Sequence, residues 1–274
     1  MKKLLGAIAA LAMTVGLAAC GTPANQGTTN PNQLVVGMEA GYPPFNWTQN
    51  DDSNGGVKIQ GTNQYAGGYD VEIAKLVAQK LGKELVIVKT EWDGLTPALI
   101  SGKIDAIIAG MSPTEERKAT IDFTDSYYDS QLVLVVKKGS KYENATSLSD
   151  FAGAKVTAQL NTFHYSVIDQ ITGVEKVTAM DNFPAMRVAL QAGTIDAYVS
   201  ELPEALSAQA ANSDFVMVKL TDGFKASPED TQTAVGVRKD STLTKEINEA
   251  LKTISSEQRL QIMQDAIKNQ PAAE

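Results

Sequence analysis

One short stretch of the chain combines residue types that can bind an anion. Ile104–Ala109 is an almost continuously apolar run, typical of a strand buried on both faces. We expect Ser112 to cap a helix that begins at Pro113, with Glu115 as its capping-box partner. Free backbone N–H groups at a helix start and the planar guanidinium of Arg117 can together hold a carboxylate. The alternative is that Arg117 is a solvated helix residue.

A weak internal repeat predicts a second half for this site. Ala98–Ala106 recurs as Ala189–Ala197, and each copy contains a helix end, a glycine and the start of a buried strand. Two copies of one α/β unit predict two similar lobes. Ligands of such sheets bind beyond the carboxyl ends of the strands, where Gly110 follows the first copy and Glu201 the second. An anion-binding end would then face a carboxylate, which is the pairing that a zwitterion needs.

The first half of the chain shows the pattern of alternating strands and helices. We expect strands at Leu34–Met38, Leu85–Val88 and Ile104–Ala109, and helices at Val71–Leu81 and at Asp93–Ser101, the second capped by Asp93. This order predicts a parallel sheet with helices on both faces. Residues 48–66 are polar and rich in Gly, Asn and Asp, so we interpret them as a surface loop or hairpin without chemistry of its own.

The N-terminus has the features of a secretory signal. Residues 1–19 hold two lysines followed by an apolar run, and the run ends in Leu-Ala-Ala-Cys-Gly. This ending resembles the bacterial lipobox, which implies cleavage before Cys20 and lipid attachment to its thiol. Residues 20–33 lack hydrophobic periodicity, so we expect a flexible tether there. The protein would therefore be extracytoplasmic and anchored to the cell membrane.

Composition excludes several classes of function. The chain carries 24 Lys and Arg against 32 Asp and Glu, a net charge of −8 that becomes −10 without residues 1–19. Such an acidic chain argues against nucleic acid or an anionic membrane surface as a partner. Cys20 is the only cysteine, so no disulfide forms within one chain. We find no metal-ligand spacing and no nucleophile motif, and predict no metal, cofactor or catalytic residue.

From residue 34 onward the chain carries several motifs in a characteristic order and spacing, which are Gly37–Phe45, Gly68–Val71, Trp92–Leu99, Ile107–Thr114 with Arg117, and Asp122–Asp125 with Tyr127 and Tyr128. Their resemblance is to the family 3 bacterial solute-binding proteins of polar amino-acid ABC transporters. It implies a type II periplasmic-binding-protein fold of two α/β lobes with mostly parallel sheets. By similarity, residues 34–128 and 233–274 form lobe 1, residues 132–223 form lobe 2, and residues 129–131 and 224–232 are the hinge crossovers.

The resemblance also implies the ligand-binding residues, which are Glu39, Tyr42, Trp92, Gly110, Met111, Ser112, Arg117, Thr162, Phe163 and Glu201. Arg117, Ser112 and Thr162 correspond to residues that bind the α-carboxylate of an amino acid. The Gly110 carbonyl and the Glu201 carboxylate correspond to the acceptors for its α-ammonium.

The same resemblance implies that Tyr42 and Trp92 enclose the ligand's side chain. It further implies a free L-amino acid as ligand, a membrane permease with its ATPases as partners, and a monomer.

The chain departs from the family pattern at three places. Glu201 stands where an aspartate is usual, and Asn161 and Phe163 stand where Gly and Thr are common, so Phe163 is expected to narrow the pocket. His164 is the only histidine, and we interpret it as a helix-surface residue.

The acidic residues favour a cationic ligand. If Glu39 faces the cleft, the two negative charges of Glu39 and Glu201 exceed the positive charge of Arg117. The side-chain cation of arginine or lysine would then restore the charge balance. Glutamine, histidine and cystine remain open, as does a sensor role with the same cleft. A dehydratase acting on arogenate or prephenate is a further alternative, with Arg117 binding a carboxylate and Glu201 or a lysine as general acid.

Overall fold

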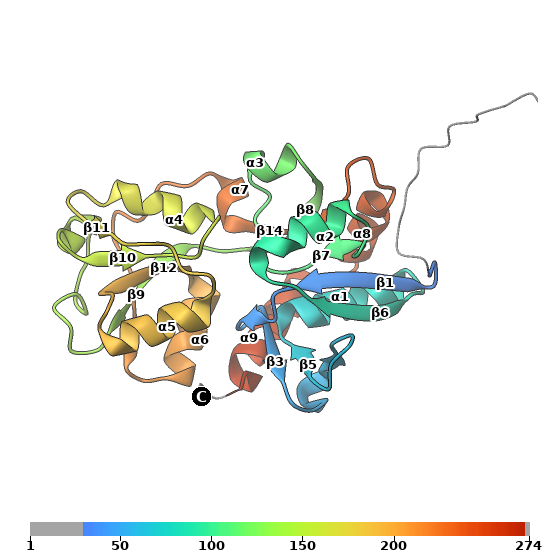
Figure 1. Cartoon of the computed structure of the whole chain (residues 1–274), viewed down its shortest axis with the longest axis horizontal. Coiled ribbons are helices and arrows are strands. Elements are labelled where there is room, and N and C mark those ends of the chain that lie inside the picture. Colours follow the sequence, from blue (N-terminus) through green and yellow to red (C-terminus); the bar gives the residue numbers. More distant parts are fainter. Residues whose placement is uncertain (1–29, 272–274) are drawn as a thin grey trace, which may run out of the picture.

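The computed structural model of the chain has two lobes, each built on a five-stranded sheet (Figure 1). The structure describes residues 30–271. The predicted signal peptide, Cys20 and most of the predicted tether therefore lie outside the described residues. Between residues 30 and 271, no helix has both the length and the apolar character needed to cross a membrane.

The sheet of lobe 1 has the strand order β6-β1-β7-β14-β8. Its strands are β1 (Gln33–Met38), β6 (Glu84–Lys89), β7 (Ala106–Ile107), β8 (Asp122–Asp129) and β14 (Gln232–Val237). β6, β1 and β7 are parallel, as the sequence predicts, and β14 is antiparallel to both of its neighbours. Residues 104–109 are all buried, although only two of them pair as a strand.

The sheet of lobe 2 repeats this arrangement, with the order β11-β10-β12-β9-β13. Its strands are β9 (Leu132–Lys137), β10 (Lys155–Thr157), β11 (Glu175–Lys176), β12 (Ala197–Glu201) and β13 (Phe215–Val218). β7 and β12, the strands of the internal repeat, are both central. The glycine that ends the helix before each, Gly102 or Gly193, adopts a left-handed conformation with φ of +76° or +73°. The predicted pair of similar lobes is thus confirmed.

Helices cover the sheets of both lobes (Figure 1). Lobe 1 carries α1 (Tyr69–Lys80), α2 (Leu95–Ile100), α3 (Glu115–Lys118), α8 (Leu243–Leu251) and α9 (Ser256–Asn269), and lobe 2 carries α4 (Phe163–Val167), α5 (Phe183–Ala192) and α6 (Leu202–Ala211). The short helix α7 (Pro228–Thr231) precedes β14. In α1, the predicted apolar face, including Ala74 and Val77, is buried.

Two predicted helix caps are wrong. The cap of α3 is Thr114, whose Oγ1 accepts from the Arg117 amide at 3.4 Å, whereas the Ser112 hydroxyl donates to the Asp230 carbonyl at 3.0 Å. Asp93 lies in a 3-10 turn before α2 and accepts from the Asn161 side chain of lobe 2 at 2.9 Å. In both cases a tertiary hydrogen bond takes the side chain that local sequence assigned to a cap.

A small third sheet borders the cleft from lobe 1. Its order is β2-β3-β5-β4, with β2 (Gly41–Tyr42), β3 (Asn46–Gln49), β4 (Val57–Lys58) and β5 (Tyr65–Gly67). Within the segment 48–66, predicted as a surface loop or hairpin, only residues 48–49, 57–58 and 65–66 are strand residues of this sheet. β2 presents Tyr42 to the cleft, so the sheet positions one wall of the site.

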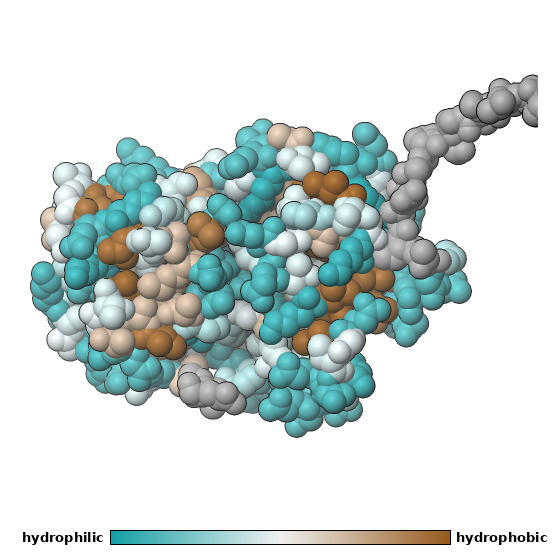
Figure 2. Space-filling model, viewed as in Figure 1, coloured by the Kyte–Doolittle hydropathy of each residue, from teal (hydrophilic) through white to brown (hydrophobic). Residues whose placement is uncertain are grey.

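The chain passes between the two large sheets twice, from β8 to β9 and from β13 to β14. The two passages lie side by side, because the Ser130 amide donates to the Thr231 carbonyl at 3.0 Å. Buried apolar residues of lobe 1 and of the α5–α6 side of lobe 2 form one continuous cluster. On the face in Figure 2, most of the surface is hydrophilic with scattered apolar patches, the usual pattern of a water-soluble surface.

Candidate functional site

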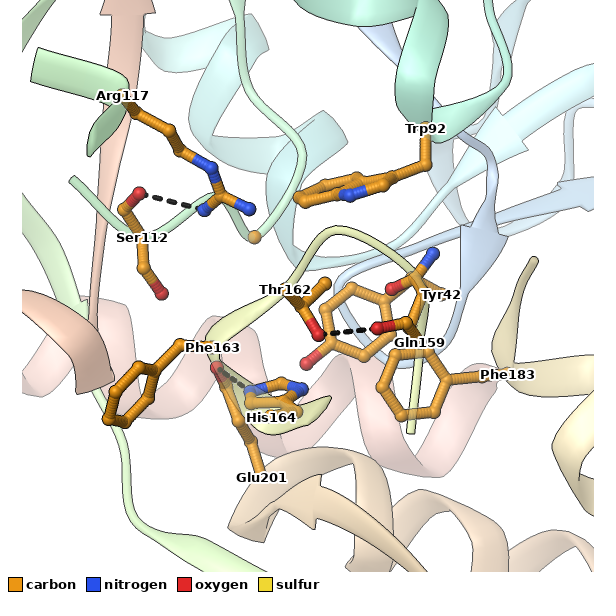
Figure 3. A pocket seen from close by; sticks show the side chains of 11 residues that line it. Tyr42, Trp92, Ser112, Arg117, Gln159, Thr162, Phe163, His164, Phe183 and Glu201 are labelled. Carbon is orange, nitrogen blue, oxygen red and sulfur yellow. Dashed lines mark hydrogen bonds and ion pairs between the residues drawn. The ribbon is translucent and has the colours of Figure 1, made fainter. Parts of the chain in front are cut away.

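A small cavity lies between the lobes and is lined from both sides (Figure 3). Its volume is about 20 Å³, which is room for roughly one water molecule. Lobe 1 supplies Tyr42, Trp92, Gly110, Ser112 and Arg117, and lobe 2 supplies Gln159, Thr162, Phe163, His164, Phe183 and Glu201. An amino acid fits only after the lobes separate or these side chains move.

Arg117 is a cation that has no carboxylate partner among residues 30–271. Its Nη1 donates to the Ser112 carbonyl at 2.9 Å and its Nη2 donates to the Asn161 carbonyl of lobe 2 at 3.1 Å. The guanidinium carbon lies 5.1 Å from the centre of the Trp92 ring, a cation–π geometry. Burial lowers the pKa of Arg117 to about 10, so the group stays charged at neutral pH. A half-buried guanidinium bonded only to neutral oxygens favours binding of an anion.

Glu201 brings the opposite charge from the carboxyl end of β12. The residue is buried, and its Oε1 lies 3.2 Å from His164 Nε2. Within the described chain, Oε2 has no hydrogen-bond partner, and neither has the hydroxyl of Tyr42. Burial and the nearby Glu201 carboxylate raise the pKa of Tyr42 well above its ordinary value. These unpaired oxygens favour a hydrogen-bond donor at this end of the cavity.

Gly110 follows β7 and lies beneath the Tyr42 ring. Its φ is +62°, and a Cβ atom there would lie 2.7 Å from Tyr42 Cε1, so only glycine fits. The Gly110 amide donates to the Tyr127 hydroxyl at 3.1 Å, and that hydroxyl donates to Asp70 at 2.7 Å. Asp70 also accepts from the Asn46 side chain at 2.8 Å. Burial raises the pKa of Asp70 to about 7 in spite of these hydrogen bonds.

The aromatic walls differ from the prediction in one respect. Tyr42 stacks on Phe45 on one face, with ring centres 4.9 Å apart, and on Phe183 of lobe 2 on the other, at 4.4 Å. Neither face of Tyr42 is therefore free in this conformation. Trp92 lies across the cavity near Arg117 (Figure 3). Phe163 lines the opposite wall and is the first residue of α4.

Glu39 and Met111 are the predicted ligand-binding residues that do not line this cavity. The buried Glu39 carboxylate accepts from Gln159 Nε2 of lobe 2 at 3.1 Å, and the same Nε2 donates to the Asp181 carbonyl at 3.0 Å. Glu39 thus lies behind Gln159. Burial raises its pKa to about 7. Met111 is buried and borders the outer cleft described below.

The outer cleft continues the cavity toward solvent and has a volume of about 830 Å³. Trp92, Arg117, Thr162 and Phe163 border both spaces. The charged residues that line the cleft are Asp93, Glu115, Glu116, Asp230 and Arg117. Four carboxylates against one guanidinium make this entrance acidic, which favours the approach of a cation.

Three lining residues were missed or misjudged from the sequence. His164 is buried against Glu201, so its interpretation as a surface residue is wrong. Gln159 comes two residues after β10, and Phe183 is the first residue of α5. Gln159 could have been predicted from its position just after a strand, and Phe183 from its position at the start of a helix on the cleft side. Asn161, which stands where glycine is common in the family, has φ of +54°. Asparagine adopts this left-handed conformation more readily than most other residues, so it can replace glycine here.

Comparison with known proteins gives a consistent result. The family model for bacterial extracellular solute-binding proteins, family 3, matches residues 34–267. The arginine-binding extracellular protein ArtP of Bacillus subtilis (strain 168) is 29% identical, over 95% of this chain and 96% of that protein. The ABC transporter glutamine-binding protein GlnH of the same organism is 30% identical, over 99% of this chain and 100% of that protein.

A solved structure supports the same conclusion about the fold. An amino acid ABC transporter substrate-binding protein from Streptococcus pneumoniae Canada MDR_19A, bound to L-arginine, superimposes with a TM-score of 0.76. The two sequences are 27% identical, and the match covers 86% of this chain and 94% of that one.

Proposed function

Since the chain belongs to the bacterial extracellular solute-binding proteins, family 3, we propose that it captures one L-amino acid between its lobes for an ABC transporter. One observation supports this most strongly. In the part of the chain that the structure describes, Arg117 of lobe 1 lacks a carboxylate partner, Glu201 of lobe 2 has an unpaired carboxylate oxygen, and both line one cavity. The carboxylate and ammonium of an amino acid complement these two groups.

We assign the backbone of the ligand to five residues. Arg117 binds the α-carboxylate in bidentate fashion. The hydroxyls of Ser112 and Thr162, which here donate to the Asp230 and Gln159 carbonyls at 3.0 and 2.7 Å, turn to the carboxylate in this proposal. The Gly110 carbonyl and the Glu201 carboxylate accept from the α-ammonium. All five line the cavity, three from lobe 1 and two from lobe 2.

The ligand's side chain extends between Tyr42 and Trp92 in this proposal, toward Gln159 and Glu39. We favour arginine, with lysine as the second choice, because Glu39 and Glu201 outnumber Arg117 and the outer cleft is acidic. The proteins of B. subtilis and S. pneumoniae that are named for arginine or bound to it support this choice. Glutamine is the alternative, since GlnH matches the full length of the chain.

Binding is coupled to closure of the lobes. The groups that recognise the two charges lie on different lobes, so the ligand gains its full set of contacts only when both lobes enclose it. The closed form is then recognised by a membrane permease that works with cytoplasmic ATPases. We further propose that the protein acts as a monomer, anchored outside the cell through a lipid on Cys20, and has no catalytic role.

A thermal-shift screen tests the proposal. The chain starting at Gly21 retains both lobes and is heated with each of the twenty amino acids, cystine, ornithine and citrulline. Ligands that bind only the native state raise the melting temperature as their concentration increases. We expect the largest rise with arginine. Agmatine, which is arginine without its carboxylate, is the matched control and should give almost none.

Other outcomes are equally informative. A rise in melting temperature with glutamine or cystine alone would still support amino-acid capture, but it would contradict the charge argument for arginine. No rise with any amino acid would contradict the proposed function.

A further inference from the structure

Asp70 and Tyr127 form a buried polar pair that ends at the ligand site and has no role in the binding scheme above. Both residues are fully buried in lobe 1. Asp70 lies in the first turn of α1, and Tyr127 lies on β8, more than fifty residues later. The Tyr127 hydroxyl donates to Asp70 Oδ1 at 2.7 Å and accepts from the Gly110 amide at 3.1 Å. The pair thus connects α1 to the backbone of the cavity wall.

This connection holds a backbone segment that needs support. Gly110 has φ of +62°, a conformation in which glycine has other states close in energy. The Tyr42 ring packs against it, and on the interior side the Gly110 amide donates to the Tyr127 hydroxyl, with the Asp70 carboxylate close to the same amide. Burial and the Asp70 carboxylate raise the pKa of Tyr127 well above its ordinary value. The hydroxyl therefore keeps the proton that it donates to Asp70.

We propose that Asp70 and Tyr127 are positioning residues that orient Gly110 so that its carbonyl accepts a hydrogen bond from the ligand's α-ammonium. This inference rests on the proposed function. Asp70 aligns the Tyr127 hydroxyl, and the hydroxyl fixes the peptide unit that carries the Gly110 amide. In this proposal the fixed unit limits the rotation of Gly110 and so orients its carbonyl, which belongs to the next peptide unit. The pair contacts no side chain of the ligand, so it contributes to the affinity for any amino acid.

The chain supplies a matched control. Tyr128 is next to Tyr127 on the same strand and makes edge contacts with Phe45 and Tyr69, but its hydroxyl has no hydrogen bond to Gly110 or Asp70. Tyr127→Phe removes only the hydroxyl that supports Gly110. Tyr128→Phe removes a hydroxyl of the same kind one residue away.

The test measures dissociation constants by calorimetry for L-arginine and L-glutamine with the unchanged chain and both variants. We expect Tyr127→Phe to weaken whichever amino acid binds by about tenfold, the size of the charge-assisted hydrogen bond between the ligand's ammonium and the Gly110 carbonyl that the variant misplaces. Tyr128→Phe should change the constant less than twofold. An unchanged constant in Tyr127→Phe, with or without a lower melting temperature, would overturn the positioning role.

Two further measurements separate positioning from a general loss of structure. In Asp70→Asn the amide oxygen still accepts from Tyr127, and Asn46, whose own Oδ1 is unpaired, can turn to accept from the new amide. We expect this variant to bind within about threefold of the unchanged chain. Asp70→Ala, which removes the acceptor, should bind as weakly as Tyr127→Phe.

The second measurement uses 5-guanidinopentanoate, which is arginine without its α-amino group, as a competitor of the bound amino acid. Its affinity should be equal for Tyr127→Phe and the unchanged chain, and an equal loss for it and for L-arginine would contradict an effect through the ammonium. If the unchanged chain binds neither amino acid, the proposed function itself fails. If only the positioning role is wrong, the unchanged chain still binds its amino acid and Tyr127→Phe binds it equally well.

Discussion

Replacing Glu39 with glutamine should stabilise the protein at pH 8, and much less at pH 5. Glu39 is 5% exposed and accepts from Gln159 across the cleft. Burial raises its pKa from the ordinary 4.5 to about 7. A glutamine oxygen can accept the same hydrogen bond without carrying a charge, so the substitution removes the ionisation and keeps the contact.

The direction and size of the effect follow from proton linkage. The folded state keeps the Glu39 proton up to about pH 7, whereas the unfolded chain loses it near pH 4.5. As far as Glu39 is concerned, the free energy of unfolding is therefore highest below pH 4.5, and it falls as the pH rises from 4.5 to about 7. The difference in pKa corresponds to at most about 3 kcal/mol. We expect Glu39→Gln to raise the free energy of unfolding by about 1 to 3 kcal/mol at pH 8.

Urea unfolding at pH 5 and pH 8 measures this free energy directly. The control is Glu175→Gln, which replaces an exposed carboxylate on β11. Asp70, whose pKa is also about 7, keeps titrating in every variant, so the unchanged chain and Glu39→Gln should both lose some stability at high pH. A variant that is no more stable than the unchanged chain at pH 8 would refute the claim that burial of Glu39 is costly.

Two substitutions test the ligand contacts. Arg117→Ala should weaken every amino acid that binds by at least about thirtyfold, roughly 2 kcal/mol, because it leaves the ligand's carboxylate buried without a partner; titration calorimetry measures this, and Lys118→Ala is the control. Phe183→Ala should tighten arginine binding by about two- to tenfold, because the Phe183 ring covers the face of Tyr42 that the ligand's side chain needs. Weaker binding in Phe183→Ala would show instead that Phe183 is part of the ligand's own contact surface.

The sequence located the charged groups of the site because strand ends determine their positions. Arg117 follows the strand end marked by Gly110, and Glu201 ends the matching strand of the repeat, so the parallel-sheet rule places each at the carboxyl edge of its own sheet. Phe183 and His164 could not be found in this way. Their burial depends on how lobe 2 packs against lobe 1 and against itself, which periodicity within one segment does not report.

Local rules failed where tertiary contacts compete with them. Ser112 followed by proline has the pattern of a helix cap, but a hydrogen bond to the Asp230 carbonyl in the returning crossover segment takes its hydroxyl. Asp70 resembles an ordinary acidic residue in the first turn of a helix, where it would favour the helix dipole. Only the fold shows that α1 directs it inward, to Tyr127 and Asn46.

The contacts between the lobes indicate why a ligand can control closure. Near the cavity, lobe 1 makes three polar contacts with one short segment of lobe 2, residues 159–161: Glu39 to Gln159, Asp93 to Asn161, and Arg117 to the Asn161 carbonyl. Each such hydrogen bond contributes about 1 to 3 kcal/mol net. The lobes also share buried apolar contacts, such as the stacking of Tyr42 on Phe183. An amino acid adds charged groups for Arg117 and Glu201 on opposite sides of the cleft, and this difference in contacts between the open and the closed lobes is what lets the ligand shift the balance between them.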